Sequence, residues 1–154
     1  MKWLDRVLLL TLLIITATAC AGPAATATPD WQTYTNSETG FSIQYPSAWK
    51  MEALPDQNSG ALHGISLKGA EGGVELYWGT GLGGGCTPEG IQNIQVAQGE
   101  LQTCYAKSAD GTEHWENISK NLSNVSFSAR AYTTDTASSS HDLLLKVIST
   151  LSFP

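Results

Sequence analysis

Alternation of apolar and polar residues is the dominant pattern of the chain from residue 31 onward. Within residues 41–45, the apolar side chains of Phe41, Ile43 and Tyr45 take every second position. Strict alternation predicts a strand with one face buried and the other face in water. Residues 125–133 show the same pattern and are predicted to form a strand as well. The inward-facing residues of this second strand are predicted to be Val125, Phe127, Ala129 and Ala131.

Turn-forming residues divide the rest of this region into further short strands. Gly69 to Gly72 and the pair Gly99-Glu100 each separate two such segments, and Asp110-Gly111 is a dipeptide typical of tight hairpins. Sequential strands joined by short turns pair antiparallel with each other. The other predicted strands are residues 31–35, 49–54, 62–68, 73–78, 91–97, 101–106 and 113–118.

The carboxyl end of the chain has a different period. Its apolar residues recur at the three- and four-residue spacing of a helix that buries one face. We expect Ser138 to Ser140 to supply the amino-terminal cap of this helix, with Asp142 in its first turn. Many strands followed by one closing helix predict an α+β fold with a largely antiparallel sheet. The buried residues of the helix are predicted to be Leu144, Val147, Ile148 and Leu151.

Two segments near the start of the domain resemble the opening hairpin of PsbP-like domains. They are residues 34–36 (Tyr-Thr-Asn) and residues 40–49 (Gly-Phe-Ser-Ile-Gln-Tyr-Pro-Ser-Ala-Trp). The terminal helix running into residues 151–153 also resembles the close of such domains. The resemblance implies the Mog1/PsbP fold, an antiparallel sheet flanked by helices. In photosynthetic organisms, members of this family assist oxygen evolution by photosystem II. A glycine-rich loop (residues 79–90) and the pair Cys86 and Cys104 are not part of the pattern of those members, so the resemblance implies the fold and not the activity.

The first nineteen residues have the composition of an export signal. Lys2 and Arg6 precede an almost wholly apolar run over residues 7–15, and small residues follow it. This run is too short to span a bilayer, which takes about 20 apolar residues. The segment Ala17-Thr18-Ala19-Cys20 resembles the lipobox of bacterial lipoproteins, in which the cysteine is lipidated and becomes the first residue of the mature chain.

Cys20 is therefore the predicted lipidation site of a protein exported to the cell envelope. We expect residues 1–19 to be the signal peptide, residues 20–30 the lipidated cysteine and a Pro/Ala-rich tether, and residues 31–154 the folded domain. The tether has no large apolar side chain and cannot bury enough surface to become ordered. The alternative is an ordinary signal cut after Ala19, which would leave Cys20 as a free thiol.

The charge balance excludes one class of partner. The chain has 8 basic and 14 acidic residues and a formal net charge of −6. Loss of residues 1–19 removes Lys2, Arg6 and Asp5, which leaves 6 basic and 13 acidic residues and a net charge of −7. Binding to a nucleic-acid backbone depends on clustered cations, and the sequence has no run of Lys and Arg. We therefore expect no nucleic-acid partner.

The two remaining cysteines, Cys86 and Cys104, are predicted to form a disulfide because the protein is exported. A reactive or metal-binding thiol pair is the alternative, but no other cysteine or histidine completes a zinc-like spacing. Cys86 lies in a glycine-rich loop, residues 79–90. Gly79, Gly81 and Gly84 match a dinucleotide-binding fingerprint in form, but no helix of useful length follows them. We expect the loop to present Cys86 to Cys104.

No set of residues predicts catalysis, and we expect no metal or cofactor. His63, His114 and His141 are far apart in the sequence without ligand spacing, and no nucleophile elbow is present. Tyr77 and Trp78 border the glycine-rich loop, and alternation predicts that one of them faces outward. An exposed aromatic ring there could stack on a sugar or a peptide, whereas the alternative is a core position. The candidate ligand-binding residues are therefore Tyr77, Trp78, Gly81 and Gly84.

These observations favour a non-enzymatic binding or assembly module that a lipid holds at the membrane. We expect its partner to be an envelope protein or a glycan. One alternative is a small envelope hydrolase or a sugar-binding or sugar-acting protein that uses Trp78 and the glycine-rich loop. The other is a purely structural envelope protein.

Overall fold

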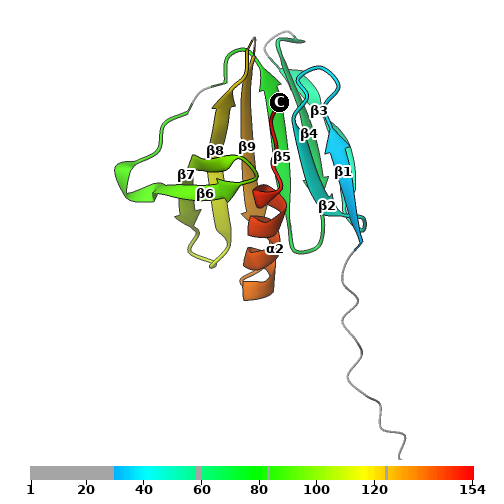
Figure 1. The fold of residues 1–154 in the computed structure, drawn as a ribbon. Coiled ribbons are helices and arrows are strands. Elements are labelled where there is room, and N and C mark those ends of the chain that lie inside the picture. The colour runs from blue at the N-terminus through cyan, green and yellow to red at the C-terminus, as the bar shows by residue number, and fades with distance from the viewer. Residues whose placement is uncertain (1–29, 58–59, 83, 124) are drawn as a thin grey trace, which may run out of the picture.

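The computed structural model describes residues 30–57, 60–82, 84–123 and 125–154. Within these ranges the chain forms a two-stranded hairpin, a seven-stranded sheet and one α-helix (Figure 1). The hairpin consists of β1 (Trp31–Thr35) and β2 (Ser42–Pro46), and the helix is α2 (Ser138–Ser149). All strand pairs are antiparallel, so the predicted α+β fold with an antiparallel sheet is confirmed.

The large sheet has the strand order β3-β4-β5-β9-β8-β7-β6, so β3 and β6 are its edges. The pairing of β5 with β9 joins two groups of strands that follow each other in sequence, β3-β4-β5 and β6-β7-β8-β9. A short 3-10 helix, η2 (Pro88–Gly90), precedes β6. The strands are β3 (Lys50–Gln57), β4 (Leu62–Lys68), β5 (Gly72–Gly79), β6 (Ile91–Val96), β7 (Gly99–Lys107), β8 (Glu113–Asn121) and β9 (Ser126–Thr133).

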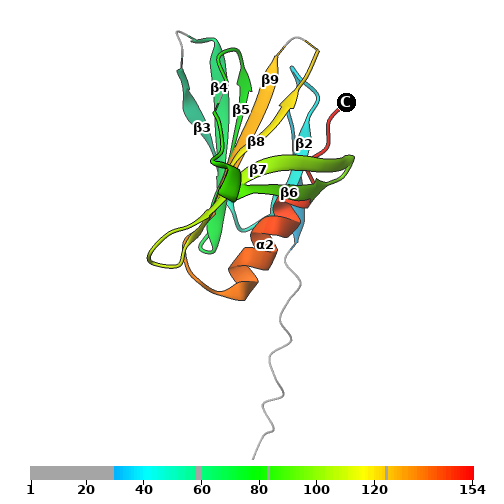
Figure 2. The same cartoon turned by 90° about the vertical axis from the view of Figure 1, so that its left-hand side faces the viewer.

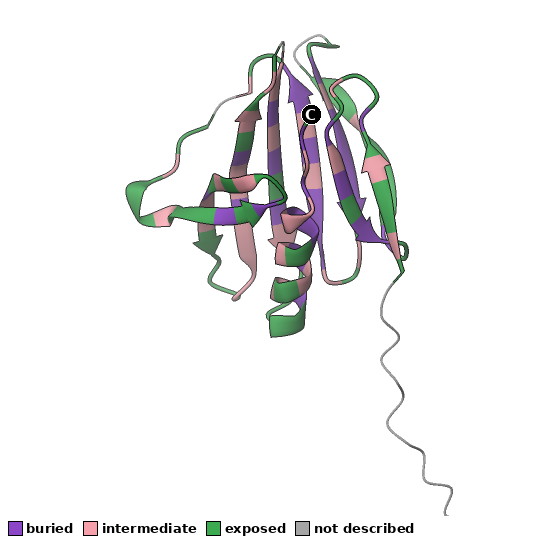
Figure 3. Ribbon diagram, in the orientation of Figure 1, coloured by how far each residue is buried: buried purple, intermediate pink, exposed green. Residues whose placement is uncertain are grey.

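The core lies between one face of this sheet and a cover made by α2 and the β1–β2 hairpin (Figure 3). Phe41, Ile43 and Tyr45 of the hairpin segment are buried, as the alternation predicted. Phe127 is fully buried, and its ring centroid lies 4.8 Å from that of Phe41 and 5.0 Å from that of Phe153. Ala129 and Ala131 are also buried, whereas Val125 is half-buried and precedes β9.

The helix buries the predicted face but begins earlier than expected. Leu144, Val147 and Ile148 are fully buried, and Leu151 packs into the core just beyond the helix end. The predicted serine cap is wrong, because Ala137 is the N-cap residue and no side chain caps the helix. The Asp135 carboxylate accepts the N–H of Ala137 at 3.0 Å and turns the chain into the helix earlier. Consequently Ser140 is inside the helix and Asp142 lies beyond its first turn.

Strands β6 and β7 form an arm that bends toward the helix. β7 pairs with β8 only from Cys104 to Lys107. This paired stretch lies next to the turn that joins the two strands, which contains Asp110-Gly111 as predicted. A bulge in β8 lies between Trp115 and Ile118, and Asn117 within it has a φ of 56°. Bulges bend a strand and increase its twist. β6 is therefore carried across to contact α2 (Figure 2).

The predicted signal peptide and the tether with Cys20 lie outside the described residues, apart from Asp30. Among the described residues, no helix is long and apolar enough to cross a membrane. Strand β1 begins at Trp31, whose indole ring lies 4.8 Å from the Lys146 ammonium of α2. The first strand is thus in direct contact with the helix.

Candidate functional site

Trp78 is a core residue and does not face the solvent beside the glycine-rich loop. Its side chain lies on the inner face of β5 and is 8% exposed. The indole Nε1 donates a hydrogen bond to Glu38 Oε2 at 3.2 Å, and the ring packs edge-on against Phe41 with centroids 5.6 Å apart. The core position that the sequence left open is therefore the one observed.

Tyr77 is the residue of this pair that faces outward, and its hydroxyl is held by two partners. The hydroxyl donates to Glu75 Oε2 at 2.7 Å and accepts from Arg130 Nη2 at 2.8 Å. Burial and the hydrogen bond to Glu75 raise the pKa of Tyr77 to about 12. The ring lies over Gly64, where a Cβ would come within 2.9 Å of Tyr77 Cδ1. These contacts give Tyr77 a structural role on the outer face of the sheet.

The glycine-rich loop is attached to the sheet through its cysteine. Cys86 and Cys104 form a disulfide with Cα atoms 5.1 Å apart, and Asn117 Nδ2 lies 3.2 Å from the Cys104 sulfur. Gly84 packs so closely on Asn117 that a Cβ would lie 2.5 Å from its Oδ1. The loop closes a small cavity of about 110 Å³ over the outer face of β8 and β9. Gly81 borders a separate shallow hollow between the loop and the β8–β9 turn.

A larger groove lies between β6 and α2, and the sequence did not indicate it. Its volume is about 470 Å³. We call it the β6–α2 groove. Its lining residues come from positions that are about 50 residues apart in the chain. They are Gln92, Asn93, Ile94, Gln95, Trp115, His141, Leu145, Lys146 and Ser149.

A chain of polar contacts holds His141 in place at the border of this groove. The Nδ1 atom of His141 lies 2.6 Å from Glu113 Oε2, and the Tyr105 hydroxyl donates to Glu113 Oε1 at 2.7 Å. The Lys107 ammonium lies 3.6 Å from the same carboxylate. Because a carboxylate only accepts, Nδ1 carries the shared proton and Nε2 is the ring nitrogen left over. His141 is thus a positioned polar group, and its partner Glu113 could not be recognised from spacing.

The pKa values of Glu113 and Tyr105 shift in the directions that these contacts predict. The hydrogen bond from Tyr105, together with His141 and Lys107, lowers the pKa of Glu113 below its ordinary value of 4.5. The same hydrogen bond raises the pKa of Tyr105, because ionising the phenol would remove the donor. Glu113 is therefore a carboxylate throughout the neutral range, and it orients His141.

Amide, apolar and basic side chains make up the lining of the groove. Its lining includes no Asp, Glu or Cys, and the hydroxyl of Ser149 donates to the Lys146 carbonyl at 2.7 Å, so His141 does not activate it. Elsewhere in the described ranges, His63 pairs with Asp56 at 2.8 Å, and no three metal-ligating side chains gather. Amide side chains, a cation and apolar groups can recognise a ligand through hydrogen bonds and burial.

The lowered pKa of Glu113 predicts an acid-sensitive contribution to stability. In the unfolded chain this carboxyl binds a proton at higher pH than in the folded chain, so folding loses stability as the pH falls below about 5. In a Glu113→Gln variant this part of the pH dependence should vanish. The free-energy difference from the wild type should be largest near pH 7 and shrink below pH 4.5. Urea unfolding followed by tryptophan fluorescence from pH 3 to 7 measures it.

The matched control is Glu89→Gln, because Glu89 is exposed on η2 and should leave the wild-type profile unchanged. Some acid dependence remains in the Glu113→Gln variant, since hydrogen bonds from Thr112 also lower the pKa of Asp110. Parallel wild-type and Glu113→Gln profiles would show that Glu113 does not titrate as the contacts require.

Comparison with known proteins gives little guidance. No protein-family model matches the chain, and no curated protein matches it significantly. A solved structure from Bacteroides thetaiotaomicron aligns with a TM-score of 0.40 and 14% sequence identity over 74% of this chain. The chain spans 45% of the length of that protein. A likeness at this level does not identify a family.

Proposed function

We propose that this protein is an exported lipoprotein, tethered to a membrane of the cell envelope through Cys20, whose domain binds a partner without catalysing a reaction. The single observation that carries the binding role is the β6–α2 groove, with its volume of about 470 Å³ and its lining of amide, apolar and basic side chains. The signal-like first nineteen residues and Cys20 support the anchor.

We further propose that the domain is a PsbP-like domain of the Mog1/PsbP fold. The support is the resemblance of residues 34–36 and 40–49 to the opening hairpin of such domains, together with the antiparallel sheet and its closing helix. This assignment concerns the fold. The photosystem role of some family members is not part of the proposal.

The anchor would restrict where the groove finds its partner. Ten residues separate Cys20 from Trp31, and an extended chain of that length reaches at most about 35 Å. A tether of this reach would keep the groove near the surface of the membrane, where envelope proteins and glycans are the available partners. The alternative role in sugar chemistry at Trp78 has less support, because that indole is packed in the core.

Site-directed photo-crosslinking tests the binding role in intact membranes. A photoreactive amino acid in place of Asn93, which is exposed on β6 beside the groove, is expected to give a discrete adduct of the lipidated protein. The matched control replaces Glu52, which is exposed on β3 at the other edge of the sheet. Adducts of equal yield at both positions, or no adduct at position 93, would contradict binding at the groove.

A further inference from the structure

The β6–α2 groove runs along the edge of a strand. Four consecutive residues of β6, from Gln92 to Gln95, border it. Side chains of consecutive strand residues point to opposite faces of a sheet, so a groove bordered by all four must follow the backbone edge. β6 is the last strand of the sheet, and no described strand pairs with its outer edge. Alternate residues of β6 therefore direct backbone N–H and C=O groups into the groove.

The opposite wall of the groove is one face of α2. His141, Leu145 and Ser149 line it at a spacing of four residues, which places them on a single helix face. α2 and β6 converge toward the end of β6, where the Ala97 N–H donates to the Leu151 carbonyl at 3.2 Å (Figure 2). The groove is thus a slot that is closed at one end, and its strand side extends for about 13 Å at ~3.3 Å per residue.

The two edges of the sheet differ in their protection against strand pairing. β3, the other edge, carries Lys50, Glu52, Pro55 and Asp56 and has a register shift after Leu54. Charges, proline and bulges are the features that keep an edge strand from pairing with another chain. β6 has the sequence Ile-Gln-Asn-Ile-Gln-Val, with no charge and no proline. α2 covers the end of β6 near Ala97, and the stretch from Gln92 to Gln95 borders the groove, where its outer edge is available to an added strand.

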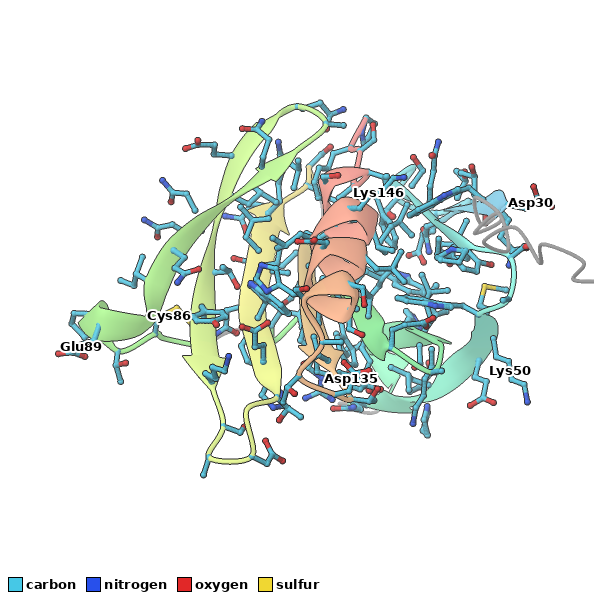
Figure 4. All side chains as sticks on the ribbon, turned by 90° about the horizontal axis from the view of Figure 1, so that it is seen from below. Asp30, Lys50, Cys86, Glu89, Asp135 and Lys146 are labelled. Carbon is cyan, nitrogen blue, oxygen red and sulfur yellow. A yellow bond between two sulfur atoms is a disulfide. The ribbon has the colours of Figure 1, made fainter. Side chains whose placement is uncertain are left out.

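Lys146 is the cation that the groove offers to a ligand. The ionisable residues that line the groove are His141 and Lys146, and His141 is already paired with the Glu113 carboxylate at 2.6 Å. The Lys146 ammonium rests on the Trp31 ring, and none of the ion pairs among the described residues involves it. Figure 4 shows Lys146 on α2, the helix that forms one wall of the groove. This charge complements an acidic group on a ligand.

We propose that the β6–α2 groove binds a short, extended, acidic peptide segment of a partner protein, which adds to β6 as an antiparallel or parallel strand and places a carboxylate at Lys146. This inference rests on the proposed binding function and names its ligand class. A peptide is the ligand whose backbone repeats donors and acceptors at the spacing of a strand edge. The slot accommodates three or four residues, because its strand side is formed by four.

A displayed library of random heptapeptides, selected against the purified domain, tests this proposal. We expect enrichment of sequences with Asp or Glu and β-branched residues, whose binding is then measured by fluorescence polarisation. N-methylation of the selected peptide at alternate residues should weaken binding more than tenfold. Methylation of the intervening residues should leave binding nearly unchanged, because only every second N–H faces β6.

The charge component is tested with a pair of lysine variants that both lie on the surface. Lys146→Glu is expected to weaken binding of the selected peptide about fivefold or more at low salt, with a smaller loss at 0.5 M salt. Lys50→Glu on β3 makes the same charge change at the other edge and should leave binding unchanged. Equal loss in both variants would mean that net charge, and not the slot, attracts the peptide.

The outcomes separate this inference from the function on which it rests. If position 93 crosslinks a partner in membranes but no peptide is enriched, strand addition is wrong and the binding function stands. The same holds if N-methylation weakens peptide binding equally at alternate and intervening residues. A crosslinked glycan would overturn the peptide assignment in the same way. A stable dimer in light scattering that blocks crosslinking at position 93 would also overturn it. If neither peptides nor crosslinks are found at the groove, both proposals fail.

Discussion

Replacing Phe127 with alanine is expected to lower the free energy of unfolding by about 4 kcal/mol. Phe127 lies on β9 and its side chain is fully buried in the core. Its ring contacts those of Phe41 in the hairpin segment and Phe153 near the chain end, so it joins the sheet to both parts of its cover. Removing the ring would forfeit its burial and two edge-to-face pairs and leave a cavity. Against a typical domain stability of roughly 5–15 kcal/mol, this loss is severe.

Chemical denaturation followed by tryptophan fluorescence measures this effect. The matched control is Ser128→Ala, since Ser128 is the next residue of β9 and its side chain faces the outer side of the sheet. We expect the control to change the unfolding free energy by less than about 0.5 kcal/mol. A loss of less than 1 kcal/mol for Phe127→Ala would show that the hairpin and the chain end are not packed on the sheet as described.

A Cys20→Ser variant is expected to leave the membrane fraction completely. If Cys20 carries the lipid, serine at this position removes the acyl chains, and about 0.8 kcal/mol per buried CH₂ is lost with them. The net negative charge of the chain disfavours attachment of the domain to anionic lipid surfaces in place of the lipid. Fractionation of cells that express the wild type and the variant measures the change, and the mass of the amino-terminal peptide identifies the lipid.

The control for this experiment is the double variant Cys86→Ser/Cys104→Ser. It also removes cysteines, but these belong to the disulfide within the domain, so the protein should stay with the membrane. A Cys20→Ser protein that remains in the membrane fraction would refute lipid anchoring. An unmodified Cys20 in the wild type would indicate the alternative, an ordinary signal peptide cut after Ala19.

Anchoring and the groove together suggest how the protein would work. A lipid at Cys20 would concentrate the domain at a membrane, and the β6–α2 groove would supply specificity for a segment of a neighbouring protein. Local concentration on a surface reduces the affinity that a single small site needs. A slot of four strand residues is compatible with such a weak, specific interaction.

Local features of the fold followed from the sequence because they depend on short-range pattern. The two-residue period placed Phe41, Ile43 and Tyr45 in the core, and the helical period did the same for Leu144 and Ile148. The turn at Asp110-Gly111 was also predictable, because its residues prefer that backbone geometry. The partner of Cys86 followed from elimination, since Cys104 is the other cysteine of the domain.

Two features could not be predicted from the sequence: the residue at which α2 begins and the face of β5 that is buried. Alternation required Tyr77 and Trp78 to face opposite sides, but it cannot say which side a hairpin and a helix will cover. Packing of Phe41 against Trp78 decided that question. At the helix, the Asp135 carboxylate started the turn before the serines that seemed suited to cap it.

The sequence by itself determined the strands, the helix and the α+β class of this protein, because each depends on residues that are neighbours in the chain, and it also predicts an export signal. Only the tertiary structure decided the site. The bulge in β8 and the bend of the β6–β7 arm bring Gln92 to Gln95 beside His141 and Ser149, and they set Glu113 against His141. These contacts depend on sheet order and twist, which arise from packing of the whole domain and leave no local signature.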